Sequence, residues 1–312
     1  MKQVPDPVAA QDGRVIASHG RDAIVQDEAG RSIACRLEGR RLSVVCGDRV
    51  RWVRAHGEGA AGRITEVRPR ATVLARLNLR GETEPVAANL TQLVVVLAPV
   101  PAADFGLCDR YLAAAEWAGL KACIVANKSD LADPSGTLAA TLDEYHRIGY
   151  PVVRASKRTA DGIAELTARL AGETSVLVGQ SGVGKSSLIN RLVPGVEARV
   201  EEVSRATELG RHTTSTSSLY RLPTGGELID SPGVRDFSPP LPAPRDLAGG
   251  FREIAALAPG CRFQDCRHRR EPGCAVSAAV GEGRIPARRL ASYRRLLDLA
   301  EDMAERAPRI RR

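Results

Sequence analysis

The first seventy residues alternate between apolar and polar positions in short runs. The runs RVIAS, DAIVQD, SIACRLE, DRVRWVR and GRITEVRPR are separated by turns that contain glycine. Alternation with a period of two is typical of strands that bury one face. Five such strands predict a small antiparallel barrel or sandwich, and an oligonucleotide-binding (OB) barrel is one of a few forms that fit this pattern.

A different pattern begins near residue 90. The run QLVVVLA at 92–98 is continuously apolar, as expected for a strand covered on both faces. Strand-like and helix-like segments then alternate, which predicts a parallel sheet with helices on both faces. The expected helices are 109–120, 135–149, 162–172 and 184–193, and the expected strands are 121–126, 150–156, 174–179 and 225–230.

A proline-rich stretch at 237–247 separates this region from a mainly helical end. Residues 251–258 predict a short helix, and residues 287–306 predict an amphipathic helix. The chain is therefore expected to be a multidomain α/β protein with domains at 1–70, 71–239 and 240–312.

Net charge is unevenly distributed over these three regions. The total of +8 is the sum of 13 − 9 = +4 in residues 1–70, 17 − 19 = −2 in 71–239 and 15 − 9 = +6 in 240–312. Basic ends are typical of a polyanionic partner such as nucleic acid, although a solvated surface is the alternative. The sequence has no apolar run of membrane-spanning length and no apolar run near its start, so we expect a cytoplasmic protein without a membrane partner.

The segment GQSGVGKSS fits the phosphate-binding pattern G-x-x-x-x-G-K-[ST]. It follows a predicted strand and opens a predicted helix, which is the context that a P-loop requires. Backbone N–H groups of such a loop surround phosphates, Lys185 would neutralise them, and Ser186 would hold Mg²⁺. The candidate residues are Gly179, Gln180, Ser181, Gly182, Val183, Gly184, Lys185, Ser186 and Ser187.

The segment NKSD also follows a predicted strand. Asp130 could accept hydrogen bonds from the ring N–H and the exocyclic amine of guanine, a donor pair that adenine lacks. Asn127 would brace the loop, Lys128 would cover the base, and Ser129 lies between Lys128 and Asp130. Ser156, in the segment ASK, could approach the guanine carbonyl. Together with the P-loop, this segment predicts GTP rather than ATP as the ligand.

The segment DSPG supplies two further candidates. Asp230 can reach Mg²⁺ through water, and the N–H of Gly233 can sense the γ-phosphate. Thr213 or Thr214, in the polar segment GRHTTSTSS, could close over Mg²⁺, and spacing does not choose between them.

The residue after DSPG is Val234, where many GTPases have a glutamine that orients the attacking water. Intrinsic hydrolysis is therefore expected to be slow unless another group does this work. His212 is the nearest candidate catalytic residue. A solvated loop histidine is the alternative.

The base-reading segment precedes the P-loop, whereas ordinary GTPases have the reverse order. A parallel sheet tolerates circular permutation when its original termini lie close together. The sequence therefore predicts a circularly permuted GTPase domain.

The segment CRFQDCRHRREPGC places three cysteines and a histidine at the spacing C-x₄-C-x-H-x₅-C. Three thiolates and an imidazole suit a closed, structural Zn²⁺ site. Several arginines accompany it. Arg262, Arg267, Arg269 and Arg270 could face phosphate, and Arg288, Arg289, Arg294 and Arg295 could be solvated or contact RNA. The candidate ligands are Cys261, Cys266, His268 and Cys274.

Taken in order, NKSD, GQSGVGKSS, GRHTTS, DSPGV and the cysteine–histidine set resemble the circularly permuted GTPases that depend on the small ribosomal subunit, the RsgA/YjeQ family. The resemblance spans nearly the whole chain. It implies an N-terminal OB-fold, a central permuted P-loop GTPase domain and a C-terminal zinc-binding domain. It further implies that His212 assists hydrolysis and that a hydrophobic residue at Val234 is normal.

The resemblance also implies partners and a role. These are GTP and GDP, Mg²⁺ with the nucleotide, one structural Zn²⁺, and the small (30S) ribosomal subunit with its 16S-type rRNA, in late maturation. We expect a monomer. Two alternatives stay open: a GTP-gated RNA-binding protein with negligible hydrolysis, and a permuted GTPase of large-subunit assembly. A P-loop kinase would leave NKSD unexplained.

Overall fold

The computed structural model describes residues 10–54, 61–78, 81–133, 135–196, 217–231 and 239–306. The chain forms two compact units. Unit 1 comprises Met1–Thr91, Thr167–Leu177 and Ser186–Phe237, and unit 2 comprises Gln92–Leu166, Val178–Lys185 and Ser238–Arg312. The domain boundaries at 70 and 239 stay a prediction.

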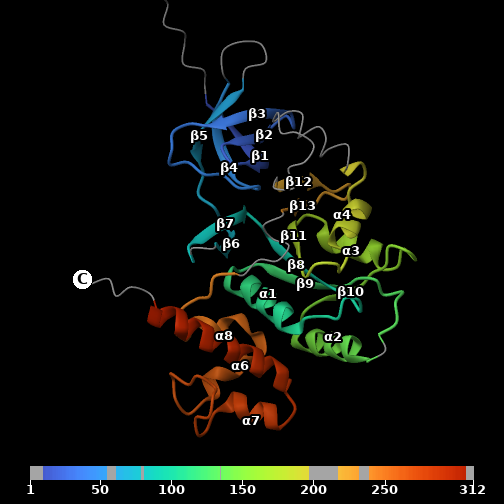
Figure 1. Cartoon of the computed structure of the whole chain (residues 1–312), viewed down its shortest axis with the longest axis vertical. Coiled ribbons are helices and arrows are strands. Elements are labelled where there is room, and N and C mark those ends of the chain that lie inside the picture. The colour runs from blue at the N-terminus through green and yellow to red at the C-terminus, as the bar shows by residue number, and fades with distance from the viewer. Residues whose placement is uncertain are drawn as a thin grey trace, which may run out of the picture. The chain divides into compact units, whose positions relative to one another are not determined.

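Unit 1 contains the five-stranded barrel expected from the alternating pattern (Figure 1). The strands pair in the order β1-β2-β3-β5-β4, and β4 pairs again with β1, which closes the barrel. The β3–β5 pair is parallel and the others are antiparallel, so the OB-like barrel is confirmed. The strands are β1 (Gln11–His19), β2 (Asp22–Asp27), β3 (Ser32–Leu37), β4 (Arg49–Val53) and β5 (Gly62–Val67).

The inward-facing residues of these strands form the core of the barrel. Val15, Val25, Trp52 and Ile64 are fully buried there. Gly62 lies against the indole ring of Trp52. A Cβ at position 62 would stand only 3.0 Å from Trp52 Cε3, so the lack of a side chain allows this close packing. The apolar alternation thus explains both the strands and the packing around the tryptophan.

The barrel continues into a second group of strands within unit 1. β11 (Thr174–Val178) is parallel to β13 (Glu227–Asp230), β13 is antiparallel to β12 (Ser217–Arg221), and β12 is antiparallel to β1. The β1–β12 register pairs Ala17 with Ser218 and Ser18 with Ser217. β6 (Val73–Leu77) and β7 (Thr83–Ala88) form a separate hairpin, which the sequence patterns did not predict.

An ion pair joins the barrel strand β1 to β13. The Arg14 guanidinium donates to the Glu227 carboxylate and, at 3.3 Å, to the Thr174 hydroxyl. Thr174 Oγ1 also donates to Glu227 at 2.8 Å. Side chains as well as backbone pairing therefore connect the barrel to the strands that follow it.

Unit 2 contains three parallel strands in the order β10-β9-β8. β8 (Gln92–Leu97) is buried along its whole length, as its continuous apolar run predicts. β9 (Lys121–Ala126) and β10 (Val152–Arg154) follow helices α1 (Phe105–Trp117) and α2 (Thr137–Ile148). Helices α3 (Ile163–Leu170) and α4 (Lys185–Leu192) contribute residues to both units.

Helix α1 begins earlier than the predicted start at residue 109. Asp104 is its N-cap and accepts a hydrogen bond from the Leu107 N–H at 2.9 Å. Asp109 instead lies inside the helix and is fully buried. The helix therefore extends one turn further toward the N-terminus than the predicted range 109–120.

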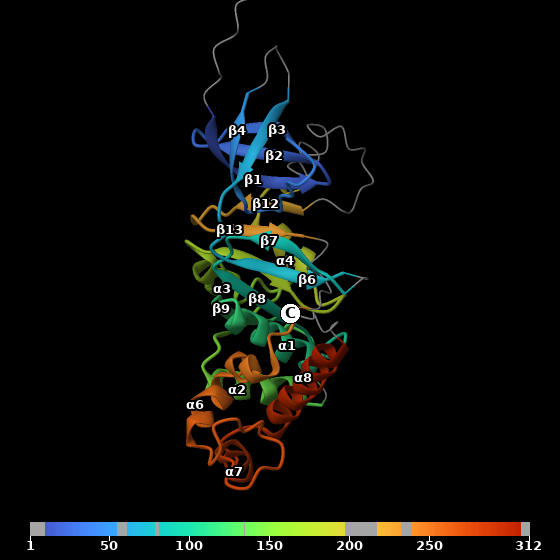
Figure 2. The same cartoon turned by 90° about the vertical axis from the view of Figure 1, so that its left-hand side faces the viewer.

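The C-terminal part of unit 2 is mainly helical, as predicted, and α8 has the predicted bounds (Figure 2). Phe251, Tyr293 and Leu297 form its core, and the two rings meet edge to face at 5.6 Å. The elements are the 3₁₀ helices η2 (Pro244–Gly250) and η3 (Ala258–Gly260), and the α-helices α6 (Arg252–Leu257), α7 (Ala275–Gly281) and α8 (Ala287–Arg306). In the part of the chain that the structure describes, no helix is both long enough and apolar enough to cross a membrane.

Candidate nucleotide and metal sites

The predicted P-loop lies between β11 and α4. Gly179, Gly182 and Gly184 all have positive φ angles, of 141°, 81° and 97°. A Cβ at Gly179 would stand 2.3 Å from the Val96 carbonyl oxygen, so only glycine fits there. The Lys185 side chain is buried, and its ammonium group donates to the carbonyl oxygens of Gly179 and, at 2.9 Å, Gln180.

The NKSD loop contacts the P-loop although the contacting residues lie 54 and 56 positions apart in the chain. Asn127 Nδ2 donates to the Val183 carbonyl at 2.8 Å. Lys128 Nζ donates to the carbonyls of Gly182 and Val100, both at 2.7 Å. A Cβ at Gly184 would stand 2.4 Å from Asn127 Nδ2, so this contact also requires glycine. The two predicted segments therefore form one site within unit 2.

Asp130 and Ser156 are also brought together. Ser156 Oγ donates to the Asp130 carboxylate at 2.5 Å, and the Arg158 guanidinium lies 3.7 Å from the same carboxylate. The hydrogen bond from Ser156 lowers the pKa of Asp130 below its ordinary value, and the Arg158 charge adds to the effect. The lowered pKa favours the ionised carboxylate of Asp130, which can only accept hydrogen bonds. The Ser156 hydroxyl thus orients Asp130, and the approach of Ser156 and its backbone to a guanine carbonyl stays a prediction.

Gln180 has a role that the motif did not indicate. Its side-chain oxygen accepts from the Asp104 N–H at 2.8 Å, and its amide nitrogen donates to the Ala102 carbonyl at 3.0 Å. The P-loop is thus fixed to the segment that caps α1. No sequence signal could have found this contact, because the motif allows any residue at this position.

The remaining predicted nucleotide residues fall into two groups. Ser186 and Ser187 lie in the first turn of α4, which begins at Lys185. Asp230 ends β13 in unit 1, and the hydroxyl of the next residue, Ser231, lies 2.7 Å from that of Ser217. The second group lies outside the described residues and keeps only its sequence-based assignment. It consists of His212, Thr213, Thr214, Gly233 and Val234.

The predicted metal ligands converge in unit 2. The ligand atoms of Cys261, Cys266, His268 and Cys274 all lie within 4.8 Å of one another. His268 Nδ1 is 3.6 Å from Cys261 Sγ and 3.5 Å from Cys274 Sγ, and these two sulfur atoms are 4.0 Å apart. A tetrahedral zinc ion with ordinary bond lengths would separate sulfur from nitrogen by about 3.6 Å and sulfur from sulfur by about 3.8 Å. This cluster could therefore hold a metal ion of that kind.

The surroundings of His268 suit a ligand. Burial lowers the pKa of its imidazole, which favours the neutral form that binds metals. The Arg294 guanidinium donates to the His268 carbonyl at 2.9 and 2.7 Å, which ties the loop to α8. Arg294 is thus a half-buried side chain engaged within the module.

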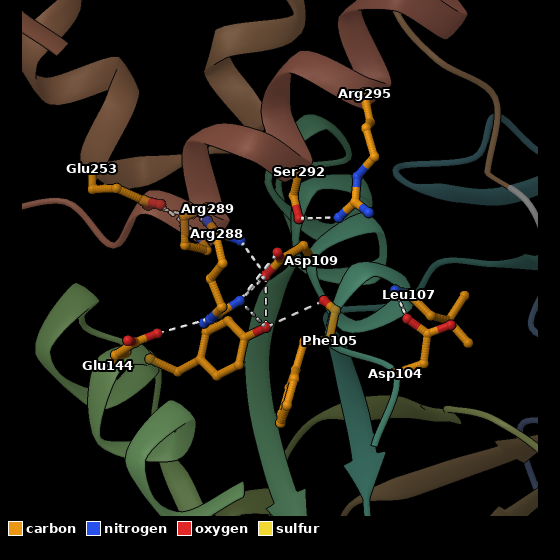
Figure 3. Close-up of polar contacts among 11 residues, drawn as sticks. Asp104, Phe105, Leu107, Asp109, Glu144, Glu253, Arg288, Arg289, Ser292 and Arg295 are labelled. Carbon is orange, nitrogen blue, oxygen red and sulfur yellow. Dashed lines mark hydrogen bonds and ion pairs between the residues drawn. The ribbon is translucent and has the colours of Figure 1, made fainter. Parts of the chain in front are cut away.

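Two more arginines of α8 lie in a buried cluster of charges against α1, α2 and α6 (Figure 3). Arg289 is fully buried and donates to Asp109 at 2.8 Å and to Glu253 at 2.6 Å. Arg288 pairs with Glu144 at 2.8 Å and with Asp109 at 3.2 Å. Arg289 is therefore not solvated, and both arginines are engaged by carboxylates whose positions lie far away in the sequence.

Two arginines between the metal ligands pair with α8 instead of facing phosphate. Arg267 contacts Glu301, and Arg269 contacts Asp298 and, at 2.8 Å, Glu301. These two arginines thus connect the loop that carries the metal ligands to α8. The expected phosphate contacts are not supported at these two positions.

A P-loop in contact with an N-K-x-D loop that precedes it in the chain defines the class: a circularly permuted P-loop GTPase, preceded by an OB-like barrel and followed by a cysteine–histidine cluster. The family model described as RsgA GTPase matches residues 67–239. This chain belongs to the RsgA GTPase family.

Curated relatives and a solved structure agree with this assignment. The chain is 47% identical over 293 residues to a small ribosomal subunit biogenesis GTPase RsgA from Azotobacter vinelandii, which covers 92% of this chain and 85% of the relative. A relative with the same name from Ectopseudomonas mendocina is 45% identical over 299 residues, covering 94% and 87%. The crystal structure of YjeQ from Thermotoga maritima matches with a TM-score of 0.74 and 31% identity, over 94% of this chain and 99% of that one.

Proposed function

We propose that this protein hydrolyses GTP to GDP and phosphate and acts in late maturation of the small ribosomal subunit. The observation that carries the proposal is the contact of Asn127 and Lys128 with the P-loop, which unites a guanine-reading loop and a phosphate-binding loop. The names of the relatives, small ribosomal subunit biogenesis GTPase, support the ribosomal role.

Roles in nucleotide binding follow from this geometry. Asp130, oriented by Ser156, accepts from the guanine base, and the P-loop N–H groups and Lys185 bind the phosphates. Mg²⁺ would stabilise the charge of the β- and γ-phosphates, and the residues that would hold it are Ser186, Asp230 and one of Thr213 and Thr214.

Hydrolysis requires a water molecule aligned with the γ-phosphate. Val234 has no group that can orient water, so His212 is assigned this positioning role. The γ-phosphate is sensed by the Gly233 N–H. A GTP-gated RNA-binding protein with negligible hydrolysis is the second candidate, and Val234 is the residue that favours it.

The flanking modules are assigned to binding rRNA of the subunit. The barrel has the strand order of an OB-like fold, a fold that binds oligonucleotides, and residues 1–70 carry a net charge of +4. The cysteine–histidine cluster is assigned to one structural Zn²⁺. The protein is placed in the cytoplasm, where ribosomal subunits mature, and is expected to act as a monomer.

The test measures GTP turnover by the purified protein alone, with isolated small subunits and with isolated large subunits. A rise with small subunits only supports the proposal. A rise with large subunits only would transfer the role to the other subunit, and no rise with either would favour the GTP-gated binder.

The assignment of His212 is tested in the same assay. His212→Ala should slow the stimulated turnover and leave GTP affinity unchanged. His146→Ala is the matched control, because His146 is an exposed residue in the last turn of α2. Equal turnover by the two variants would contradict the assignment.

A further inference from the structure

The first half of the P-loop, residues 179–182, contacts residues 100–104, a segment outside the nucleotide-binding motifs. This segment follows β8 and leads into α1, and it belongs to unit 2 together with this part of the P-loop. The Gln180 side chain connects the two. Its Nε2 donates to the Ala102 carbonyl at 3.0 Å, and its Oε1 accepts from the Asp104 N–H at 2.8 Å. The amide uses a donor and an acceptor at the same time, which fixes its orientation.

The segment that Gln180 contacts is itself held at both ends. Asp104 is the N-cap of α1, and its carboxylate accepts from the Leu107 N–H at 2.9 Å (Figure 3). At the other end, Lys128 of the NKSD loop donates to the Val100 carbonyl at 2.7 Å. These two contacts do not involve Gln180, so the segment can act as a fixed support for the P-loop.

The P-loop needs such a support because glycine gives its backbone unusual freedom. Gly179 and Gly182 have positive φ angles of 141° and 81°, and glycine loses more conformational entropy on folding than any other residue. In the second half of the loop, Val183 is fully buried and its carbonyl accepts from Asn127 at 2.8 Å. Gln180 supplies the corresponding fixed point in the first half.

A second side chain also contacts the backbone of the first half. The Lys185 ammonium donates to the carbonyl oxygens of Gly179 and Gln180. This ammonium is, however, the group assigned to neutralise the phosphates, whereas the Gln180 amide has no such task. The two hydrogen bonds of the amide can therefore persist whether or not a nucleotide is bound.

We propose that Gln180 is a positioning residue for nucleotide binding. By fastening the P-loop to residues 100–104, it keeps the N–H groups of the loop oriented for phosphates before a nucleotide arrives. A site that is only partly populated in its binding-competent conformation loses affinity by that fraction. Loss of the two hydrogen bonds should therefore weaken GTP and GDP alike, because both carry the α- and β-phosphates that a P-loop surrounds. This role rests on the proposed binding of GTP at the site.

The test replaces Gln180 by methionine, which keeps the length of the side chain and removes both hydrogen bonds. Gln264→Met is the matched control, because Gln264 is an exposed residue of unit 2. Binding of fluorescent GTP and GDP analogues is titrated with the purified protein, and GTP turnover is measured at increasing GTP concentration. Gln180→Met should raise both dissociation constants and KM about three- to tenfold, the range for one net hydrogen bond, with kcat unchanged. The control should keep all of these values.

Gln180→Glu separates positioning from packing through its pH dependence. The protonated carboxyl of this variant can donate to the Ala102 carbonyl and accept from the Asp104 N–H, whereas the ionised form has no proton to donate. Acidification should therefore bring the GTP affinity of Gln180→Glu toward that of the unchanged protein at the same pH. Protonation of Asp130 weakens binding in both proteins, so the comparison at equal pH removes its contribution.

Equal nucleotide affinities of Gln180→Met and Gln264→Met would overturn the inference, even if the Tm of Gln180→Met fell, because a merely structural glutamine affects stability alone. A lower kcat with an unchanged KM would also overturn it, as would a GTP affinity of Gln180→Glu that does not recover on acidification. Circular dichroism checks that each variant is folded, and Gln180→Glu at acidic pH carries the test if Gln180→Met is not. These titrations use no ribosomal subunits, so the turnover assay with subunits judges the proposed function separately.

Discussion

Replacing Arg289 by methionine should strongly destabilise unit 2. The side chain is fully buried and connects two carboxylates, with Nη1 2.8 Å from Asp109 and Nε 2.6 Å from Glu253. Burial alone would lower the pKa of this guanidinium, but the two carboxylates outweigh that effect and raise the pKa above its ordinary value. Removing one partner of a buried ion pair costs about 3–5 kcal/mol, because the other charge remains buried without compensation.

How much of this free-energy cost is relieved depends on whether each carboxylate has a partner other than Arg289. Asp109 keeps contacts with Arg288 and with the Tyr145 hydroxyl, which donates at 2.6 Å. Glu253 is nearly buried and has no second ion pair among the described residues. We therefore expect most of the lost unfolding free energy to come from the charge of Glu253, which would remain buried without a partner.

The assay is thermal or urea unfolding followed by tryptophan fluorescence. The chain contains two tryptophans, so a Trp52→Phe background leaves Trp117, whose Nε1 donates to the Leu247 carbonyl within unit 2. About 3–5 kcal/mol should lower the Tm by roughly 6–20 °C in a unit of this size. Arg306→Met, an exposed change on the same helix, should shift stability by no more than about 0.5 kcal/mol.

A double variant tests the electrostatic reason separately from lost packing. The cluster contains three acidic and two basic side chains, a net charge of −1, and Glu253→Gln together with Arg289→Met leaves two and one, again −1. The double variant should therefore cost clearly less than the sum of the single variants. Strict additivity, or a cost below about 1 kcal/mol for Arg289→Met, would refute this reasoning.

Three further predictions concern the two sites. Asp130→Asn should weaken GTP binding and favour xanthosine nucleotides, and an unchanged base preference in competition assays would contradict our interpretation of the loop. Ser156→Ala removes the hydrogen bond that lowers the pKa of Asp130. Because the carboxylate form binds guanine, GTP affinity should then be lost at a higher pH as the solution is acidified, which a titration with a fluorescent GTP analogue at decreasing pH measures. Cys274→Ser should lower the zinc content determined by atomic absorption and the unfolding temperature reported by Trp117, and equal metal content in the variant would exclude this ligand.

The sequence predicted the features that depend on local pattern. The bounds of α8 and the five barrel strands followed from the spacing of apolar residues. The P-loop followed from the glycines, each of which has a backbone conformation or a close contact that only glycine allows. Such a motif depends on the backbone geometry of the loop itself. It can therefore be recognised in the sequence without knowledge of distant contacts.

Features that depend on distant partners were not predicted. Arg289 and Asp109 are 180 positions apart, and nothing near either residue indicates the other. The start of α1 was also misplaced, because the Asp104 cap lies just before the apolar residues Phe105 and Leu107, upstream of the helical pattern that begins at Asp109. β12 was missed because SSLYR is short and polar, and it becomes a strand through pairing with β1 and β13.

The pairing of β1 with β12 has a consequence for dissecting this protein into parts. Removing the barrel would leave the backbone groups of Ser217 and Ser218 on that side of β12 without their partners, and exposed strand edges promote aggregation. A truncated protein that lacks residues 1–70 would therefore lose solubility as well as its barrel. Loss of ribosome binding by such a truncation would say nothing about RNA contacts, and single substitutions on the outer surface of the barrel are the informative alternative.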